Sequence, residues 1–323
     1  MSGTTTFAMR EKWPWRVGSG LRCCLAALLL VAGGAVAGAE GTGADAMPVV
    51  GDEGHTNRVR IDYGPTSTPA LTELSDMMKE RGALEKFREI FSPFRLPIEI
   101  TLRMKDCGGV SNAWYERPVV TICYEYLADI RKNMPTEAMP ASGVFAGITP
   151  TDAVFGQFFY VVAHEMGHAI FDLLDVPIFG RAEDAADAFA AYMLLELGKN
   201  DAKRLILGAA YSYQEYMKLQ NVYVKTTAFA DPHSAPMQRY YNLLCIGYGA
   251  APDMFGGLVE NGYLPKTRAD NCKMEFYEMN FAFQKSIAPH LDPVLAKQVL
   301  DKSWVPQPGS AKPPSGALWQ RPH

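Results

Sequence analysis

VVAHEMGHAIFDLLDVPIFGRAEDAADAFAAYMLL, residues 161–195, is the segment around which the chain is organised. It opens with two histidines four residues apart, His164 and His168, and a glutamate, Glu165, directly follows the first. Residues four apart lie on one face of a helix, so both imidazoles can reach the same ion. Two neutral imidazoles and a carboxylate suit Zn²⁺, which keeps a fourth position for water. Glu165 is the natural general base for that zinc-bound water, and HExxH is the metalloprotease pattern.

The residues before the motif indicate that it lies on a buried helix. Residues 155–163 are apolar and contain no proline. The alternative is a helix that carries two histidines on its surface. Polar groups within so much apolar sequence need partners, which favours the metal site.

A third ligand is expected from the next helix. Residues 175–181 contain Pro and Gly and read as a turn, and residues 182–197 read as a second helix with an acidic first turn. Glu183 and Asp187 share a face of it, so we expect Glu183 to bind the metal and Asp187 to accept the second N–H of a ligand histidine. Asp184 and Asp187 are alternative ligands, since an acidic residue in the first turn can simply complement the helix N-terminus.

This stretch resembles the signature of a bacterial metallopeptidase family that is grouped with the zincins of the glutamate-ligand type. The resemblance extends to residues 107–115 (CGGVSNAWY), 231–234 (DPHS) and 238–242 (QRYYN), so it covers about residues 71–289. It implies an α+β fold, a zincin-like metallopeptidase domain with a mixed or antiparallel sheet and an HExxH active-site helix. The resemblance names no substrate.

Strand patterns flank a possible substrate-binding segment. Residues 96–104 alternate apolar and polar, and residues 119–124 are rich in β-branched side chains. In zincin-type proteins the edge strand commonly lies along the substrate cleft, where a peptide adds by backbone pairing. Asn112, Trp114 and Tyr115 are therefore candidates for substrate contacts. Ordinary hairpin packing of the two aromatic rings is the alternative.

Further elements follow from periodicity and capping. A strand is expected around residues 58–63, and Thr151 or Asp152 is expected to cap the HExxH helix. Helices are also expected over residues 71–90, 125–134, 203–219 and 237–244.

A second polar cluster follows the metal motifs. Peptide hydrolysis builds negative charge on the attacked carbonyl oxygen, and that oxyanion needs a donor besides the metal. His233, oriented by Asp231, is a candidate, as are Arg239 and the tyrosines beside it. The alternative is a solvated loop histidine.

The N-terminus has the pattern of a secretory signal peptide. Four basic residues precede a short apolar run, residues 23–37, which ends in small residues. We expect cleavage after Ala37 or Ala39 and a periplasmic or secreted protein. An uncleaved anchor is the alternative, although about 15 residues is short for crossing a bilayer. No other stretch is long and apolar enough, so we expect no stable membrane insertion after cleavage.

Composition sets the domain organisation and excludes nucleic acid as a partner. We expect a signal peptide over residues 1–39, a linker over 40–70, a metallopeptidase domain over 71–305 and a Pro-rich disordered tail over 306–323. Without residues 1–39 the chain loses four basic residues and one acidic residue, which leaves 27 and 34 and a net charge of −7. Such a chain has no basic footprint for nucleic acid.

Cysteine usage fits an oxidising compartment. Four cysteines remain after the signal peptide, and four allow three pairings. We expect the disulfides Cys107–Cys123 and Cys245–Cys272, one in a hairpin-like unit and one in a helical unit. A cysteine-ligated metal site is disfavoured because no C-x-x-C spacing occurs.

The sequence therefore predicts an exported zinc-dependent hydrolase with one zinc per chain, most directly a metallopeptidase that acts on a peptide or protein. One alternative is a non-catalytic, zinc-stabilised envelope binding protein. Another is a hydrolase of a non-protein amide bond, such as one in the cell wall. Three convincing ligands, where a closed structural site uses four, favour catalysis. The sequence specifies no oligomeric state.

Overall fold

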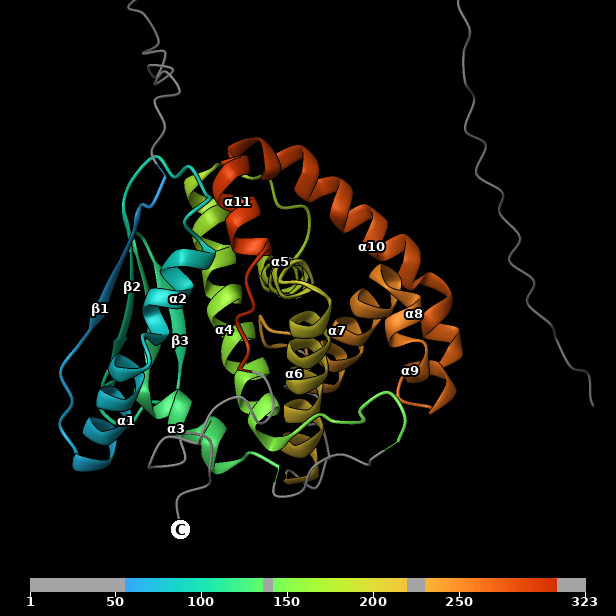
Figure 1. The fold of residues 1–323 in the computed structure, drawn as a ribbon, viewed down its shortest axis with the longest axis horizontal. Helices are drawn as coiled ribbons and strands as arrows, with labels where there is room; N and C mark the ends of the chain where they lie inside the picture. The colour runs from blue at the N-terminus through green and yellow to red at the C-terminus, as the bar shows by residue number, and fades with distance from the viewer. Residues whose placement is uncertain (1–55, 136–141, 220–229, 307–323) are drawn as a thin grey trace, which may run out of the picture. The chain divides into compact units, whose positions relative to one another are not determined.

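A small mixed sheet and a larger group of helices make up the fold, so the α+β class is confirmed (Figure 1). The structure is a computed structural model that describes residues 56–135, 142–219 and 230–306, without the side chains of residues 215–219. All of these residues belong to one compact unit. The expected signal peptide and all but the first residue of the expected tail lie outside the described residues.

Four strands form the sheet in the order β1-β2-β4-β3. The strands β1 (Val59–Tyr63), β2 (Ile100–Lys105) and β4 (Val119–Cys123) run parallel, and β3 (Ala113–Glu116) pairs antiparallel with β4 at the edge. The sheet is therefore mixed. The strand expected around residues 58–63 pairs with β2, so the sheet includes part of the segment assigned to the linker.

Two helices occupy the segment where one continuous helix, residues 71–90, is expected. They are α1 (Pro69–Glu80) and α2 (Ala83–Ile90). Gly82 separates them with φ 57°, a left-handed conformation that glycine adopts without strain and that ends a helix. The helix α3 (Tyr124–Lys132) follows β4 directly, close to its expected place.

The helix α4 (Pro150–Leu173) carries the HExxH motif, and α5 (Ala182–Glu196) follows it. The expected N-cap at Thr151 or Asp152 is wrong. Thr149 caps α4 in a reciprocal capping box with Asp152, and Pro150 takes the first helical position, where its missing N–H costs nothing. In Figure 1, α4 lies beside β3, and α5 and α6 pack on its other side.

Glycines let the backbones of α4 and α6 (Lys199–Leu219) come into contact. A Cβ atom at Gly208 would lie 2.1 Å from the Asp152 carbonyl oxygen, and one at Gly156 would lie 2.4 Å from the Ala209 nitrogen. The helix α6 begins four residues before its expected start. The next long helix, α7 (Pro236–Ala250), continues well beyond its expected end.

The chain ends in a further helical layer. It contains α10 (Lys266–Ser286), which packs against α7, and the shorter elements α8 (Pro252–Phe255), α9 (Gly257–Glu260), η2 (Ala288–His290) and α11 (Pro293–Leu300). Both expected disulfides, Cys107–Cys123 and Cys245–Cys272, are present. Among the described helices, none combines the length and the apolar character that a bilayer crossing requires.

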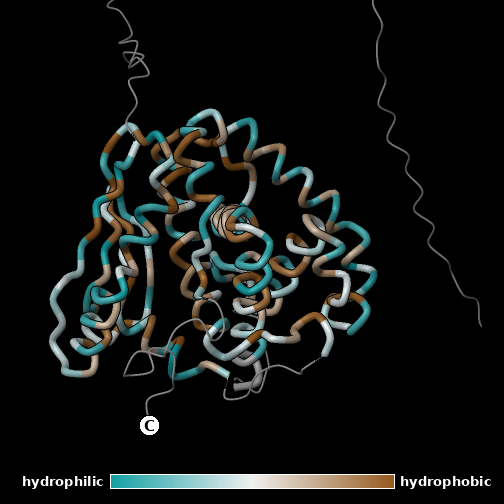
Figure 2. Tube along the Cα trace, viewed as in Figure 1, coloured by the Kyte–Doolittle hydropathy of each residue, from teal (hydrophilic) through white to brown (hydrophobic). Residues whose placement is uncertain are grey.

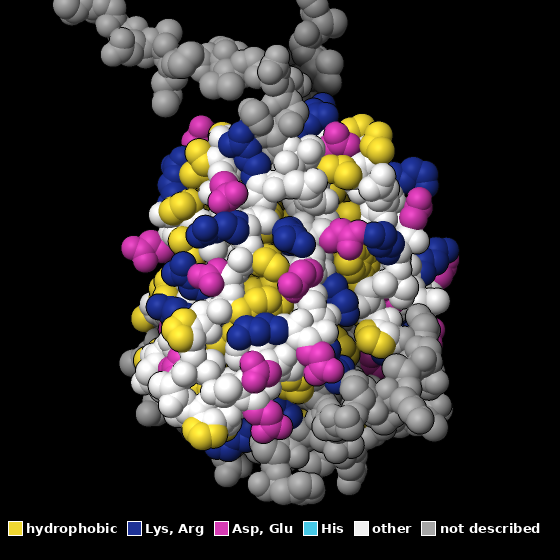
Figure 3. Space-filling view, turned by 60° about the vertical axis from the view of Figure 1, so that its left-hand side comes forward, with side chains coloured by type: hydrophobic (Ala, Val, Ile, Leu, Met, Phe, Trp, Pro, Cys, Tyr) yellow, Lys and Arg dark blue, Asp and Glu magenta, His cyan; other side chains and the backbone are white. Residues whose placement is uncertain are grey.

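The distribution of side chains agrees with this layered arrangement. Hydrophobic positions run through the strands and through α4 (Figure 2), and most of α4 is buried. On the face shown in Figure 3, Lys and Arg side chains are interspersed with Asp and Glu. That face offers no extended basic surface for a nucleic acid.

Candidate metal centre

Three predicted ligands converge between α4 and α5. His164 and His168 lie one turn apart on α4, and Glu183 comes from the first turn of α5. Oε2 of Glu183 lies 3.0 Å from Nε2 of His164 and 3.3 Å from Nε2 of His168, and the two Nε2 atoms are 3.2 Å apart. The three donor atoms thus form a nearly equilateral triangle.

The donor atoms fit a small cation. Nδ1 of His164 lies 2.7 Å from Oδ1 of Asp187 and donates to it, so the lone pair of the neutral ring is on Nε2, which faces the other two donors. Lone pairs at about 3 Å repel unless a positive charge lies among them. A tetrahedral ion with bonds of about 2.0–2.1 Å separates its ligand atoms by about 3.3 Å. The donor set and its spacing therefore suit a zinc-sized ion.

His164 and Glu183 shift each other's pKa values through their direct contact. Burial lowers the pKa of His164, but hydrogen bonds with Asp187 and Glu183 outweigh burial and raise it to about 9. The hydrogen bond with His164 is the main reason that the pKa of Glu183 falls to about 2. The cluster thus keeps Glu183 ionised and holds positive charge at His164, where a metal cation would replace the proton.

Asp187 connects the cluster to a buried ion pair. Its side chain is 9% exposed and accepts hydrogen bonds from Nε and Nη2 of Arg239 at 2.8 and 2.6 Å. Burial raises the pKa of Asp187, but hydrogen bonds from His164 and the charge of Arg239 bring it down to about 2. Arg239, expected as an oxyanion donor, is therefore engaged with Asp187 through two of its three nitrogens.

Glu165 lies beside the cluster and has an unusual carboxyl group. It is 6% exposed, and burial together with the negative charge of Glu183 raises its pKa to about 7. The charges of His164 and Arg239 and a hydrogen bond from the Tyr115 backbone act in the opposite direction. A carboxyl group with this pKa exchanges a proton near neutral pH, as a general base does.

The loop before α7 brings His233 to the cluster. Its Nε2 lies 3.0 Å from Oε2 of Glu183, and Asp231 holds the ring through its Nδ1 at 3.2 Å. Asp231 orients His233 as expected, but His233 stands among the ligand atoms, where a fourth metal donor would stand. Arg181 fixes this loop by donating to the carbonyl oxygens of Asp231 and Pro232.

Asp184 is not brought to the cluster. Its Oδ1 accepts a hydrogen bond from Ser234 at 2.6 Å, and its other oxygen lies 3.8 Å from Nε of Arg181. The alternative ligand of the sequence thus serves the loop that carries His233. Neither Arg181 nor Ser234 is expected from the sequence, because each acts through partners about 50 residues away.

The predicted substrate-contact residues lie at the edge of the sheet, with different surroundings. Tyr115 donates from its hydroxyl to Asp172 of α4 at 2.6 Å, and its backbone reaches Glu165. Trp114 has the Lys105 ammonium 5.5 Å from its ring centroid, and Asn112 is exposed. Of the three, Tyr115 is the residue that the structure brings to the cluster.

Comparison with known protein families identifies the family of this chain. A family profile described as "Putative metallopeptidase" matches residues 63–286, more than half of the chain. The chain belongs to this family. The match confirms the resemblance seen in the sequence, and membership in a metallopeptidase family implies a metal ion, for which the His/Glu cluster supplies the donors. No curated protein and no solved structure is significantly similar to the chain.

Proposed function

We propose that this member of the metallopeptidase family is an exported, zinc-dependent hydrolase of peptide bonds. The convergence of His164, His168 and Glu183 beside a buried Glu165 carries this proposal. Two imidazoles and one carboxylate are a donor set of catalytic zinc, which binds three protein ligands and keeps one position open. Bound there, zinc would supply a Lewis acid that polarises a carbonyl group and acidifies water.

In this proposal Glu165 moves the protons. Its carboxylate accepts a proton from the attacking water as the new carbon–oxygen bond forms, and returns it to the leaving amine nitrogen as the carbon–nitrogen bond breaks. Without the metal its pKa is about 7, and a bound cation would lower it, so that the carboxylate is ionised and ready to accept the proton near neutral pH. Its burial keeps bulk water away from that exchange.

Asp187 and Arg239 would orient the ligands. Asp187 holds the Nδ1 proton of His164, which fixes the tautomer and points the Nε2 lone pair at the cluster. Arg239 in turn fixes Asp187 with two hydrogen bonds. His233, half-exposed at the open side of the cluster, remains the candidate that steadies the oxyanion.

The edge strand β3 supports a peptide as the substrate. Within the described residues β3 pairs with no strand other than β4, and an edge of this kind is where an extended chain adds by backbone pairing. Tyr115 of this strand reaches Glu165, so a peptide that adds to β3 would pass close to the general base. The two disulfides support export, since such bonds persist in oxidising compartments.

A second candidate function rests on His233. Its Nε2, 3.0 Å from Glu183, would be a fourth protein donor, and a site closed by four protein ligands is a structural site. The chain would then be a zinc-stabilised binding protein of the cell envelope. The variant His233→Ala separates the two functions. A catalytic site keeps one zinc per chain in this variant, whereas a structural site loses zinc together with much of its thermal stability.

The experiment that tests the hydrolase is Glu165→Gln in the full mature chain. We expect one zinc per chain by elemental mass spectrometry and a loss of peptide hydrolysis of at least a hundredfold, since general-base catalysis contributes about 10²–10⁴-fold. Glu278→Gln, the same exchange at an exposed residue of α10, is the control and should hydrolyse like the wild type. Equal hydrolysis by Glu165→Gln would refute the base. Assays on peptides and on peptidoglycan in parallel distinguish a peptidase from a cell-wall amidase.

A further inference from the structure

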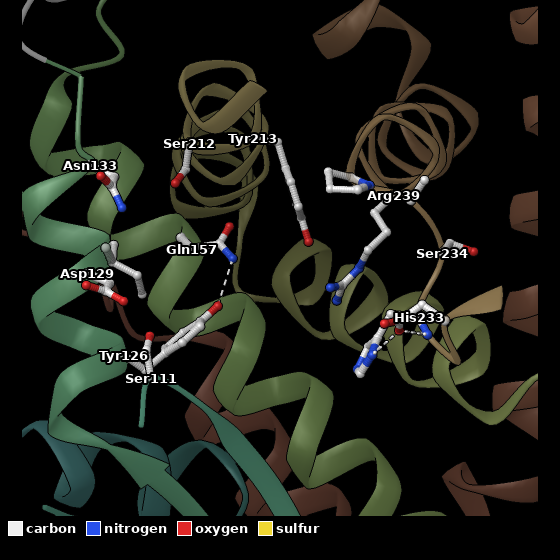
Figure 4. Close-up of a pocket in the computed structure, with 14 residues that line it drawn as sticks. Ser111, Tyr126, Asp129, Asn133, Gln157, Ser212, Tyr213, His233, Ser234 and Arg239 are labelled. Atoms are coloured by element: carbon white, nitrogen blue, oxygen red, sulfur yellow. Dashed lines mark hydrogen bonds and ion pairs between the residues drawn. The ribbon is translucent and has the colours of Figure 1, made fainter. Parts of the chain in front are cut away.

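A pocket of about 610 Å³ opens beside the candidate metal centre. His233 and Arg239 form one side of it, and side chains of α3, α4 and α6 form the other (Figure 4). Its volume lies within the range of about 300–1,000 Å³ that is usual for ligand pockets. Because His233 belongs both to this pocket and to the metal cluster, a group in the pocket would lie next to the reacting bond.

One buried polar atom of this pocket lacks a partner. Oε1 of Gln157 has no hydrogen-bond partner within the described part of the chain, and the hydroxyl of Tyr213, a residue only 7% exposed, interacts with the side chain of the same Gln157. The amide nitrogen of Gln157 donates to the Tyr126 hydroxyl at 3.2 Å, which fixes the amide and leaves Oε1 free to accept (Figure 4). Buried polar atoms in folded proteins are nearly always paired, so the unpaired acceptor of Gln157 points to a ligand with hydrogen-bond donors.

Among the described residues that line the pocket, the acidic side chains outnumber the basic one. Asp129 and Asp231 line it, and no ion pair between Asp129 and a cation occurs within the described residues. Arg239 adds little positive charge, because Asp187 neutralises it through two hydrogen bonds. A cation is therefore favoured over a neutral or an anionic ligand.

We propose that this pocket is the subsite for a basic side chain of the substrate, arginine before lysine. A guanidinium carries five N–H donors in a flat fork, which matches the free acceptor of Gln157, the Tyr213 hydroxyl and the Asp129 carboxylate. The ring of Tyr126, which lines the pocket, offers a face on which a flat cation stacks, whereas the ring of Tyr213 already faces the Arg239 guanidinium at 5.8 Å. This inference rests on the proposed function, because it assigns a preference to the same site.

Titration calorimetry of the zinc-loaded mature chain tests the subsite without any turnover. The ligands are N-acetyl-arginine amide and its neutral isostere N-acetyl-citrulline amide. We expect arginine to bind at least tenfold more tightly, since hydrogen bonds to charged groups contribute about 1.5–3 kcal/mol. Asp129→Asn should reduce this ratio to below threefold, whereas the matched control Asp270→Asn, an exposed acid of α10, should leave it unchanged.

Tyr213→Phe keeps the ring that packs over Arg239 and removes only the hydroxyl. It should therefore fold normally and weaken arginine binding about threefold to tenfold. Equal binding of arginine and citrulline by the wild type would overturn the proposal. Tighter binding of N-acetylglucosamine than of either ligand would also overturn it, because the pocket would then be a sugar site.

A cleavage profile on a mixed peptide library separates this inference from the proposed function. Cleavage beside arginine and lysine, with a higher kcat/KM than beside citrulline, supports both. Selective arginine binding without cleavage of any peptide would refute the peptidase and leave the subsite standing. Cleavage without preference for basic residues, together with unselective binding, would refute the subsite and leave the peptidase standing.

Discussion

The ion pair between Asp187 and Arg239 makes the sharpest prediction for the candidate site. In the variant Asp187→Asn, the amide oxygen can still accept the His164 proton, but the buried guanidinium loses its counter-charge. Two hydrogen bonds between charged groups, at 2.8 and 2.6 Å, become weaker neutral ones. Breaking a buried ion pair in this way costs about 3–5 kcal/mol.

The surroundings of Arg239 indicate that the loss of stability lies near the lower end of the range of about 3–5 kcal/mol. The Arg239 side chain is 19% exposed, so water regains part of it, and the rings of Tyr160 and Tyr213 lie 5.7 and 5.8 Å from its central carbon. Aromatic faces stabilise a cation by about 0.5–2 kcal/mol. We therefore expect Asp187→Asn to lower the free energy of unfolding of the metal-free protein by about 3 kcal/mol.

The variant Asp187→Asn should also bind zinc more weakly than the wild type. Residues that orient a ligand histidine typically contribute ten- to hundredfold to metal affinity, and Asp187 is the residue that holds Nδ1 of His164. Urea unfolding of the metal-free protein gives the first quantity. Competition with a chromophoric chelator gives the second.

Two further variants test whether burial of the Asp187–Arg239 ion pair causes the expected loss of stability. Asp62→Asn breaks an ion pair of similar length, 2.7 Å to Arg103. The side chains of Asp62 and Arg103 are 37% and 34% exposed, so this variant should cost less than about 1 kcal/mol. The double variant Asp187→Asn/Arg239→Met removes both charges and should lose less stability than the two single variants added together. Suppose that Asp187→Asn lowers the free energy of unfolding no more than Asp62→Asn does and leaves zinc affinity unchanged. Burial would then not strengthen the Asp187–Arg239 ion pair, and the prediction would be refuted.

Three further predictions follow from the site and from the helix packing. Hydrolysis should rise with pH as Glu165 ionises, and because a bound cation lowers its pKa, the acid limb should have a midpoint below about 7 in a kcat/KM profile. A midpoint above 7 would contradict this assignment. Removal of zinc by a chelator should abolish hydrolysis and lower Tm, and zinc should restore both, because a ligand bound only by the folded state stabilises it. Gly208→Ala should destabilise the chain by about 1–3 kcal/mol in urea unfolding, since its Cβ would lie 2.1 Å from a backbone oxygen. Gly247→Ala, whose Cβ would lie 3.3 Å from a side-chain methyl of Ile206, should cost less than about 1 kcal/mol.

Local patterns predict the elements that carry the motifs. The spacing of His164 and His168 requires a helix, and the turn at residues 175–181 separates it from the helix of Glu183, so the triad of donors follows from short-range rules. The same rules place the N-cap of α4 wrongly, although Thr149, Pro150 and Asp152 form a recognisable capping box. The break between α1 and α2 lies at Gly82, where a periodic hydrophobic pattern continues across a left-handed residue.

Local sequence patterns do not predict contacts between residues that are far apart in the chain. Arg239 and Asp187 are 52 residues apart in the chain, and periodicity does not show which helix faces which. The sequence therefore predicts an arginine near the oxyanion, where the structure has an arginine that fixes a carboxylate. Gln157 and Tyr213 likewise come from different helices, and only the packing of α4 on α6 brings both to one pocket.

The start of α5 links the candidate metal ligands to the rest of the site. Arg181, its N-cap, holds the loop of His233 through two carbonyl oxygens, and Glu183 lies two residues further on. Asp184, next to Glu183, holds the same loop through Ser234. One helical turn thus provides a candidate metal donor and both anchors of the loop that borders the pocket. We infer that the distance between His233 and Glu183 is set by α5 itself, because the start of this helix both carries Glu183 and holds the loop of His233.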